Sequence, residues 1–332
     1  MKDTLLEVRD LATEFSTDQK TLRVVDGISF DVEHGQTVGL VGESGSGKSI
    51  TSFSVMGLIK KPGRIAGGSI RLEGQELTDR SPRQMRKIRG KEIAMIFQEP
   101  MTSLNPVITI GEQIAESIRI HEGLSKRDAM QRALEMVKKV GIPMAETRLK
   151  QYPHQLSGGM RQRIMIAIAL SCNPKLLIAD EPTTALDVTI QAQILELMKE
   201  LKQETGMGVL LVTHDLGVVA EICDKVIVLY AGQIVESGPV TQVFLNPQHP
   251  YTEALLKSIP SSAGGRGKLY SIPGQVPSAN AMPQHCRFHT RCPHAFDRCK
   301  TETPQLESVQ EGHMVSCWKR DFIHAETAGH SS

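Results

Sequence analysis

The sequence is poor in aromatic residues and net charge, and it has no long apolar run. Phe, Trp and Tyr make up 4% of its 332 residues, which argues against a surface for stacking sugars or bases. Lys and Arg (38) nearly balance Asp and Glu (37), whereas proteins that bind nucleic acid usually carry a basic excess. We therefore expect no nucleic-acid partner. Apolar stretches such as Ile164–Leu170 are far shorter than the ~20 residues of a transmembrane helix. The N-terminal residues include acids and no signal-peptide core, so we expect a soluble cytosolic chain.

The apolar segments of the chain predict its fold class. Short β segments bounded by turn residues are expected near the N-terminus, at Leu5–Val8, Val24–Phe30, Thr37–Val41 and Ser69–Leu72. Buried strands are expected at Leu176–Ala179 and Val209–Thr213, and helical periodicity runs over residues 111–140 and 190–201. Ser125, with Asp128 three residues later, resembles a helix capping box. Strands alternating with helices predict an α/β fold built on a parallel sheet.

The composition shifts after about Gly238, where prolines become frequent and a Ser- and Gly-rich stretch begins at Ser261. This shift predicts one large domain over residues 1–240. Residues 241–332 are expected to form a loop-rich extension with little core of its own.

A phosphate-binding loop is predicted between the strand at 38–41 and the helix that follows it. The residues fit the pattern G-x-x-x-x-G-K-[ST] and are Gly42, Glu43, Ser44, Gly45, Ser46, Gly47, Lys48 and Ser49. Glycines let backbone N–H groups surround phosphate oxygens, and the helix N-terminus adds positive potential. Lys48 is expected to reach the β- and γ-phosphates, and Ser49 to ligate Mg²⁺.

Two adjacent carboxylates follow the buried strand at 176–179. In α/β sheets ligands bind at the carboxyl ends of the strands, where Asp180 and Glu181 are expected. Asp180 can hold Mg²⁺ through water, and Glu181 can polarise an attacking water molecule. An acidic strand end is often only a solvated turn, but after a phosphate-binding loop it predicts a nucleotide-hydrolysing site.

Further motifs resemble those of the ATP-binding-cassette (ABC) ATPases. Leu156 to Arg163 (LSGGMRQR) is similar to that family's signature motif, and Gln98 matches its Q-loop glutamine. Ala185-Leu186-Asp187 matches the D-loop, and His214 matches the switch histidine. Phe15 stands where the family places an aromatic residue under adenine, although a single Phe at a strand end is equally typical of a core. The motifs occur in the family's order over roughly residues 5–240.

The resemblance implies a fold and a set of roles. The fold is a RecA-like mixed sheet with an N-terminal antiparallel β subdomain and a helical signature subdomain at about 99–170. Two cassettes would form a head-to-tail dimer with two ATP molecules between them. Residues acting on the subunit's own ATP and Mg²⁺ would be Lys48, Ser49, Gln98, Asp180, Glu181 and His214. Ser157, Gly158 and Gly159 would contact the partner's ATP.

Two stretches resemble the dipeptide, oligopeptide and nickel importer branch of this family. They are residues 97–106 (FQEPMTSLNP) and 246–256 (NPQHPYTEALL). The likeness is strongest to ATP-binding subunits of bacterial dipeptide importers. It implies a peripheral ATPase at the cytoplasmic face of the bacterial inner membrane. Its partners would be a second, different ATPase subunit, two permease subunits and, indirectly, a periplasmic peptide-binding protein. Alternatives are the same motor for nickel, opines or sugars, or a non-transport ABC mechanoenzyme.

Four cysteines crowd the loop-rich extension. Cys286, Cys292, Cys299 and Cys317 lack the C-x₂-C zinc and C-x₂-C-x₂-C ferredoxin spacings, yet four thiolates suit zinc or a [4Fe–4S] cluster. Arg287, Arg291 and Arg298 lie among them as cations that could offset thiolate charge. The importer branch is similar in carrying a four-cysteine iron–sulfur domain, so a [4Fe–4S] cluster is favoured. Zinc, with replacement ligands from His285, His289 and His294, and metal-free thiols are the alternatives.

Overall fold

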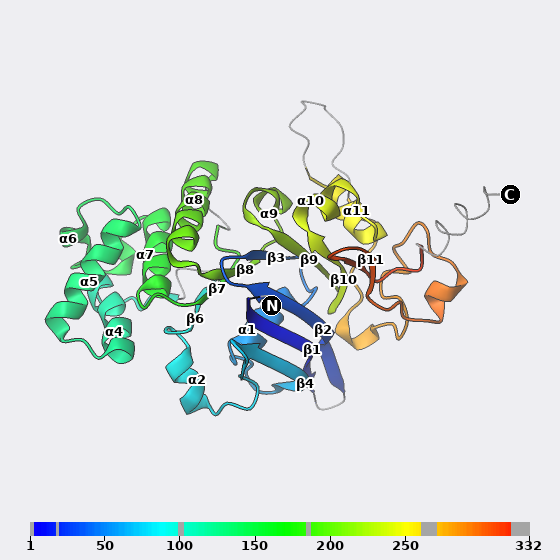
Figure 1. Ribbon diagram of the computed structural model, residues 1–332, viewed down its shortest axis with the longest axis horizontal. Coiled ribbons are helices and arrows are strands. Elements are labelled where there is room, and N and C mark those ends of the chain that lie inside the picture. Colours follow the sequence, from blue (N-terminus) through cyan, green and yellow to red (C-terminus); the bar gives the residue numbers. More distant parts are fainter. Residues whose placement is uncertain (1–2, 18–19, 99–102, 184–186, 260–270, 320–332) are drawn as a thin grey trace. The chain divides into compact units, whose positions relative to one another are not determined.

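The computed structural model describes residues 3–17, 20–98, 103–183, 187–259 and 271–319. The chain divides into two compact units (Figure 1). The first contains residues 1–6, 31–37 and 71–212, and the second contains residues 7–30, 38–70 and 213–332. Residues 99–102, the D-loop pair Ala185 and Leu186, and the stretch from Ser261 to Tyr270 lie outside the described residues. The predicted boundary at residue 240 stays a prediction.

The first unit is built on a parallel sheet. Its strands β6 (Ile93–Ile96), β7 (Leu176–Asp180) and β8 (Gly208–Val212) lie in the order β8-β7-β6. Ile93 pairs with Leu176, and Leu176 pairs with Gly208, so the carboxyl ends of the three strands lie side by side. Nearly every residue of these strands is buried, as a sheet covered on both faces requires.

Helices make up much of the rest of the first unit (Figure 1). They are α2 (Pro82–Ile88), α4 (Ile110–Glu122), α5 (Lys126–Lys139), α6 (Ala145–Arg148), α7 (Gly158–Leu170) and α8 (Val188–Thr205). A 3₁₀ turn covers Pro153–Gln155, and the two-residue strand β5 (Gln75–Glu76) follows a turn. The helical stretch predicted over 111–140 consists of two helices. It breaks because Gly123 caps α4 in the left-handed conformation and Ser125 caps α5, where it accepts the N–H of Asp128.

The second unit holds most of the N-terminal strands β1 (Thr4–Ser16), β2 (Thr21–Glu33) and β4 (Gly63–Leu72), in the order β2-β1-β4. It also holds β3 (Thr37–Val41), β9 (Lys225–Tyr230), β10 (Gln233–Pro239), β11 (Glu307–Gln310) and β12 (His313–Val315). These run in the order β11-β12-β10-β9-β3, with β3 parallel to β9 and the remaining pairs antiparallel. Its helices are α1 (Lys48–Val55), α9 (Leu216–Ile222), α10 (Val240–Leu245) and α11 (Pro250–Lys257).

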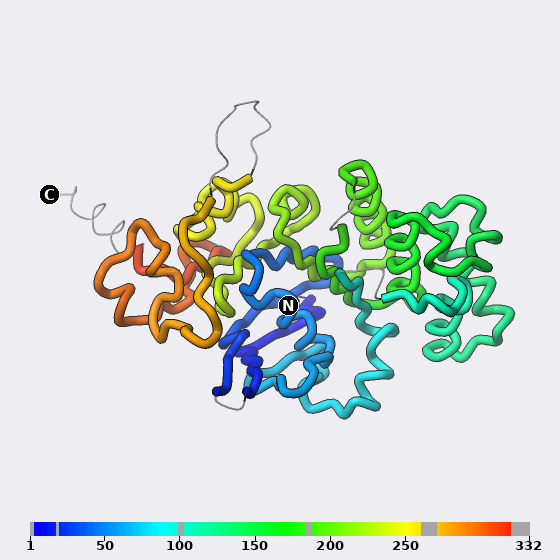
Figure 2. Tube along the Cα trace, turned by 180° about the vertical axis from the view of Figure 1, so that it is seen from behind, coloured from blue at the N-terminus to red at the C-terminus, as the bar shows by residue number. Residues whose placement is uncertain are grey.

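The C-terminal extension is loop-rich, as predicted, but it contributes to a core. Figure 2 shows its path over residues 271–319 as a series of loops, with short 3₁₀ turns at Ala279–Ala281 and Asp297–Lys300. Tyr251 and Phe288 are buried in one apolar cluster with Val228 and Tyr230 of β9. The extension thus packs these aromatic residues onto strands of the predicted large domain. The expectation that it has little core of its own stays a prediction.

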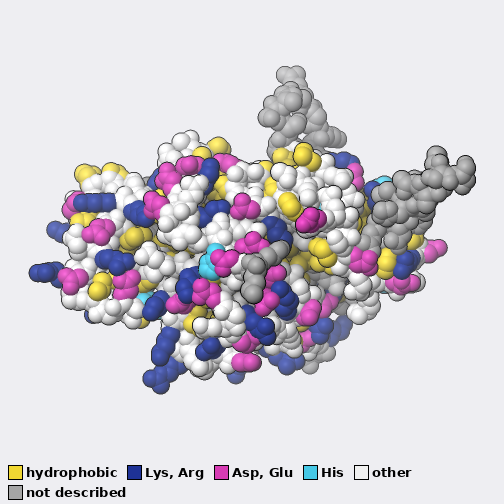
Figure 3. Space-filling model, in the orientation of Figure 1, with side chains coloured by type: hydrophobic (Ala, Val, Ile, Leu, Met, Phe, Trp, Pro, Cys, Tyr) yellow, Lys and Arg dark blue, Asp and Glu magenta, His cyan; other side chains and the backbone are white. Residues whose placement is uncertain are grey.

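The surface agrees with the balanced composition. On the face drawn in Figure 3, Lys and Arg are interspersed with Asp and Glu. In the described part of the chain, no helix combines the length and the apolar character that crossing a bilayer requires.

Candidate functional site

The predicted phosphate-binding loop joins β3 to α1 in the second unit. Gly42, Gly45 and Gly47 have φ angles of 150°, 79° and 105°. Residues that carry a Cβ atom rarely adopt such positive φ angles. A Cβ atom at Gly42 would collide with the carbonyl oxygen of Leu229, and one at Gly47 would lie 3.1 Å from that of Val24. The glycines at 42 and 47 are therefore required by close backbone approach as well as by conformation.

Lys48 begins α1 and lies across the loop. Its Nζ donates to the carbonyl oxygens of Gly42 at 2.7 Å and Glu43 at 3.0 Å, and the residue is only 7% exposed. The hydroxyl of Ser46 is buried inside the loop without a hydrogen-bond partner. A buried ammonium, an unpaired hydroxyl and a helix N-terminus suit a phosphate group, which accepts hydrogen bonds and carries the opposite charge.

Phe15 and His214 also belong to the second unit. Phe15 is half-buried at the end of β1, and its ring lies against Gly63, where a Cβ would come within 2.6 Å of it. His214 is exposed and stands just before α9, whose N-terminus is capped by Asp215. Their roles toward adenine and γ-phosphate stay predictions.

The acidic pair lies at the carboxyl end of β7 in the first unit. Asp180 is the last residue of the strand and is 3% exposed. Glu181 has a φ of 48°, a left-handed conformation that costs a non-glycine residue about 1 kcal/mol or more. Gln98 follows the neighbouring strand β6, and its Nε2 donates to Glu181 Oε2 at 2.9 Å. The two parallel strands thus bring together an amide and a carboxylate that lie 83 residues apart in the sequence.

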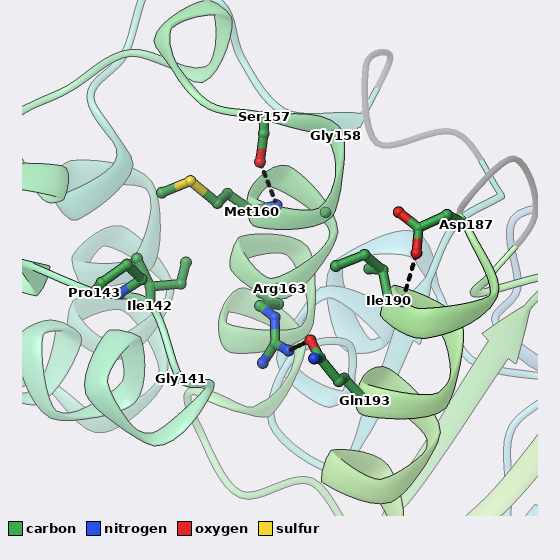
Figure 4. Close-up of a pocket in the computed structure, with 11 residues that line it drawn as sticks. Gly141, Ile142, Pro143, Ser157, Gly158, Met160, Arg163, Asp187, Ile190 and Gln193 are labelled. Atoms are coloured by element: carbon green, nitrogen blue, oxygen red, sulfur yellow. Dashed lines mark hydrogen bonds between the residues drawn. The ribbon is translucent and has the colours of Figure 1, made fainter.

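A hollow opens where α7 and α8 begin, also in the first unit (Figure 4). Ser157 caps α7 by accepting the N–H of Met160, and Asp187 caps α8 by accepting that of Ile190. Both caps, with Gly158 and Gly159, line a cavity of 480 Å³ that Arg163 also lines. A helix N-terminus beside a guanidinium offers a positive environment for an anion. The structure thus brings the predicted signature residues and Asp187 to one cavity.

The four cysteine thiols of the extension line a single small cavity of 20 Å³, together with His289 and His294. All four thiols are free. Burial raises the pKa of Cys286 to about 11 and that of Cys317 to about 12, and it also raises the pKa of Cys292. Thiolate chemistry fits iron–sulfur or zinc ligation. Among the described residues, however, no group of three or more Cys, His, Asp or Glu side chains is placed to hold a metal ion. The structure therefore does not support the predicted cluster.

The arginines among the cysteines have other partners than thiolates, which corrects the expectation that they offset thiolate charge. Arg287 pairs with Asp26, Arg291 with Glu43 and Arg298 with Glu302. Arg298 also lies over the ring of Trp318, 3.5 Å from its centroid.

Two residues that contact the phosphate-binding loop were not expected there. The hydroxyl of Tyr251 accepts the N–H of Glu43 at 2.8 Å, and the guanidinium of Arg291 binds the carboxylate of Glu43. The sequence held one signal for these contacts. Glu43 is an acidic residue within a predicted phosphate-binding loop, and a partly buried carboxylate there requires a cationic or hydrogen-bonding partner.

Comparison with protein families gives two matches along the chain. Residues 25–184 match the family described as "ABC transporter". Residues 235–299 match "Oligopeptide/dipeptide transporter, C-terminal region".

Individual proteins resemble the chain over most of its length. The oligopeptide transport ATP-binding protein AppD of Bacillus subtilis is 56% identical, over 99% of both chains. The dipeptide transport ATP-binding protein DppD of Escherichia coli is 51% identical, over 94% of this chain and 96% of its own. Among solved structures, the ATP-binding cassette MJ0796, a dimer in a post-hydrolysis state bound to ADP and Pi, is 28% identical with a TM-score of 0.65. That match covers 71% of this chain and 99% of the cassette.

Proposed function

The chain belongs to the ATP-binding proteins of the ABC transporters, and from that premise we propose that it is the ATP-hydrolysing subunit of a bacterial peptide importer. The observation that carries the proposal is the phosphate-binding loop, with its required glycines and with Lys48 buried at the start of α1. ATP supplies the polyphosphate that this loop suits, and Mg²⁺ accompanies it. Ser49, Gln98 and Asp180 would be the residues toward the Mg²⁺ ion.

Hydrolysis of ATP is assigned to the carboxylate at the end of β7. Glu181 would accept a proton from the attacking water, and Gln98 holds that carboxylate in place through the 2.9 Å hydrogen bond. His214 would contact the γ-phosphate. In phosphoryl transfer the protein contributes mainly positioning and charge stabilisation, which these polar side chains and the helix N-terminus of α1 can provide.

The cavity at the start of α7 is assigned to the ATP of a second cassette. Ser157, Gly158 and Gly159 would offer a hydroxyl and backbone N–H groups to its γ-phosphate, with Asp187 beside them. The dimeric state of the related cassette MJ0796 supports this assignment. We propose that the second cassette is a different chain, as the importer branch implies.

Peptides are the proposed cargo because the related proteins AppD and DppD are named for oligopeptide and dipeptide transport. These names favour peptide over nickel or opine. The chain would act at the cytoplasmic face of the inner membrane, beneath two separate permease subunits that receive peptide from a binding protein. Closing and opening of the cassette dimer would then switch the permeases between inward-facing and outward-facing states.

A metal centre in the extension is a further part of the proposal. Cys286, Cys292, Cys299 and Cys317 already line one cavity, and they would hold a [4Fe–4S] cluster or, as the alternative, zinc. Such a centre would stabilise a segment that has few regular elements. Anaerobic purification with iron, sulfide and zinc analysis tests this. About four irons per chain support the cluster, one zinc supports the alternative, and no metal overturns both.

The transport function is tested by reconstituting the chain with its permeases and second cassette in vesicles. We expect ATP hydrolysis to rise when peptide-loaded binding protein is added, and to be lost in Lys48→Ala, because the phosphates lose their counter-ion. In matched vesicles supplied with nickel and a nickel-binding protein, the rate of ATP hydrolysis should not increase. Stimulation by nickel alone would overturn the peptide assignment but not the ATPase assignment.

A further inference from the structure

Glu43, the first residue after Gly42 in the phosphate-binding loop, is held from two directions by the C-terminal extension. The hydroxyl of Tyr251 accepts its backbone N–H at 2.8 Å. The guanidinium of Arg291 donates to both oxygens of its carboxylate, with Nη1 2.7 Å from Oε2 and Nη2 3.0 Å from Oε1. This paired geometry is the strongest form of an Arg–carboxylate contact.

The two residues that hold Glu43 are themselves fixed by packing. The Arg291 side chain is 3% exposed, and its Nε donates to the carbonyl of Pro273 at 2.8 Å. Tyr251 is fully buried, and its ring contacts those of Tyr230 and Phe288, with centroids 4.6 Å and 5.4 Å away. Because these two side chains are closely packed, they cannot readily move with the loop, and they hold Glu43 in one position.

The position of Glu43 matters for the groups that face phosphate. Its carbonyl accepts both the ammonium of Lys48 at 3.0 Å and the N–H of Ser46 at 3.2 Å. A shift of Glu43 therefore moves the cation and the loop backbone together. Charge gives a second reason, because an unpaired carboxylate in this loop would repel a polyphosphate. Arg291 supplies the compensating charge.

A second, parallel connection reaches the other side of the loop. Arg287 pairs with Asp26 and donates to the carbonyl of Ala231 at 2.5 Å. The next residue, Gly232, donates its N–H to the carbonyl of Ser46 at 2.8 Å. Arg287 directly follows Cys286, and Arg291 directly precedes Cys292, so one short segment bearing two of the four cysteines contacts the loop directly through Arg291 and indirectly, by way of Ala231 and Gly232, through Arg287.

We propose that Arg291 and Tyr251 are positioning residues of the nucleotide site, through which the C-terminal extension presets the phosphate-binding loop for ATP. The inference rests on the proposed ATPase function. It adds that nucleotide affinity depends on an extension that lies outside the matched cassette region, residues 25–184.

The test is binding of a fluorescent, ribose-labelled ATP analogue with Mg²⁺ to the full chain. Arg291→Gln should raise the Kd for the analogue about tenfold. A change of this size is within the range of coupling energies between residues in direct contact, here Arg291 and Glu43. Tyr251→Phe removes one hydroxyl, keeps the ring packing and should raise the Kd several-fold. The matched control is Arg298→Gln. Like Arg291, it directly precedes a cysteine, but its partner Glu302 lies outside the loop.

A double-mutant cycle separates positioning from general stability. If Arg291 acts through Glu43, Arg291→Gln should have little further effect in a Glu43→Gln chain, where the repelling charge is already gone. In the reconstituted transporter, Arg291→Gln should raise the KM for ATP and leave kcat near the wild-type value.

The outcomes distinguish this inference from the proposed function. If the wild-type chain binds no nucleotide, the ATPase assignment itself fails. If wild type binds and Tyr251→Phe and Arg291→Gln both bind equally well, the positioning role is refuted. Equal weakening by the Arg298→Gln control would also refute it, because the effect would then be one of fold stability.

Discussion

The buried carboxylate of Glu236 gives the strongest stability prediction. Glu236 lies in β10 with no exposed surface and accepts the backbone N–H groups of Gln248 at 2.8 Å and His249 at 2.9 Å. Its Oε1 is also 2.7 Å from Nε2 of His313, which is equally buried. The carboxylate thus ties the segment before α11 and strand β12 to β10.

Glu236→Ala would leave these three nitrogen groups buried without their acceptor. Each lost partner costs about 1–3 kcal/mol, and breaking a buried pair costs about 3–5 kcal/mol. We therefore expect the free energy of unfolding of the extension to fall by about 3–5 kcal/mol.

Urea unfolding followed by tryptophan fluorescence measures this loss, because Trp318 is the single tryptophan of the chain and lies in the extension. Glu302→Ala is the control. It breaks only the ion pair between Glu302 and Arg298, whose side chains are 55% and 42% exposed respectively. Exposed ion pairs contribute about 1 kcal/mol or less. A loss below about 1 kcal/mol in Glu236→Ala would show that the buried carboxylate does not stabilise the extension.

Two further predictions concern the phosphate-binding loop and the thiols. Gly42→Ala should abolish nucleotide binding because its Cβ would strike the carbonyl of Leu229, whereas Gly45→Ala, which meets no atom within 4 Å, should cost only the strain of its φ of 79°. Titration with a labelled nucleotide checks both, and equal binding by the two variants would contradict the steric argument. At pH 8, alkylation of the metal-free chain should be slower than at an exposed thiol, on the order of 100-fold at Cys286 and on the order of 1,000-fold at Cys317, because their pKa values near 11 and 12 leave little thiolate. Their rates, followed by mass spectrometry, should climb as the pH rises towards 11, and rapid labelling at pH 8 would count against the burial.

Local patterns were sufficient to predict the nucleotide-binding loop. Lys48 contacts carbonyl oxygens only five and six residues away, so this part of the loop follows from the motif spacing. The atoms that exclude a side chain at Gly42 and Gly47 belong instead to the distant residues Leu229 and Val24. The strands β7 and β8 were predictable for a similar reason, because a strand buried on both faces reads as a continuous apolar run. Gln98 and Glu181 could be assigned by motif order, but their hydrogen bond depends on the pairing of β6 with β7.

The extension was less predictable because its order comes from tertiary packing. Tyr251 and Phe288 are isolated aromatic residues in Pro-rich stretches and show no periodicity, yet both are buried against Tyr230. The contact of Arg291 with Glu43 joins residues 248 positions apart. Sequence proximity suggested that the arginines serve the neighbouring cysteines, whereas the structure directs Arg287 and Arg291 to carboxylates.

ATP binding and hydrolysis, measured side by side in Glu181→Gln, show directly whether Glu181 is the base of the reaction. The substitution keeps the size of the side chain and its place beside Gln98 but removes the carboxylate that would accept a proton from water. We expect the variant to bind ATP as tightly as wild type and to hydrolyse almost none of it. Turnover near the wild-type rate would contradict the assignment of Glu181 as the base.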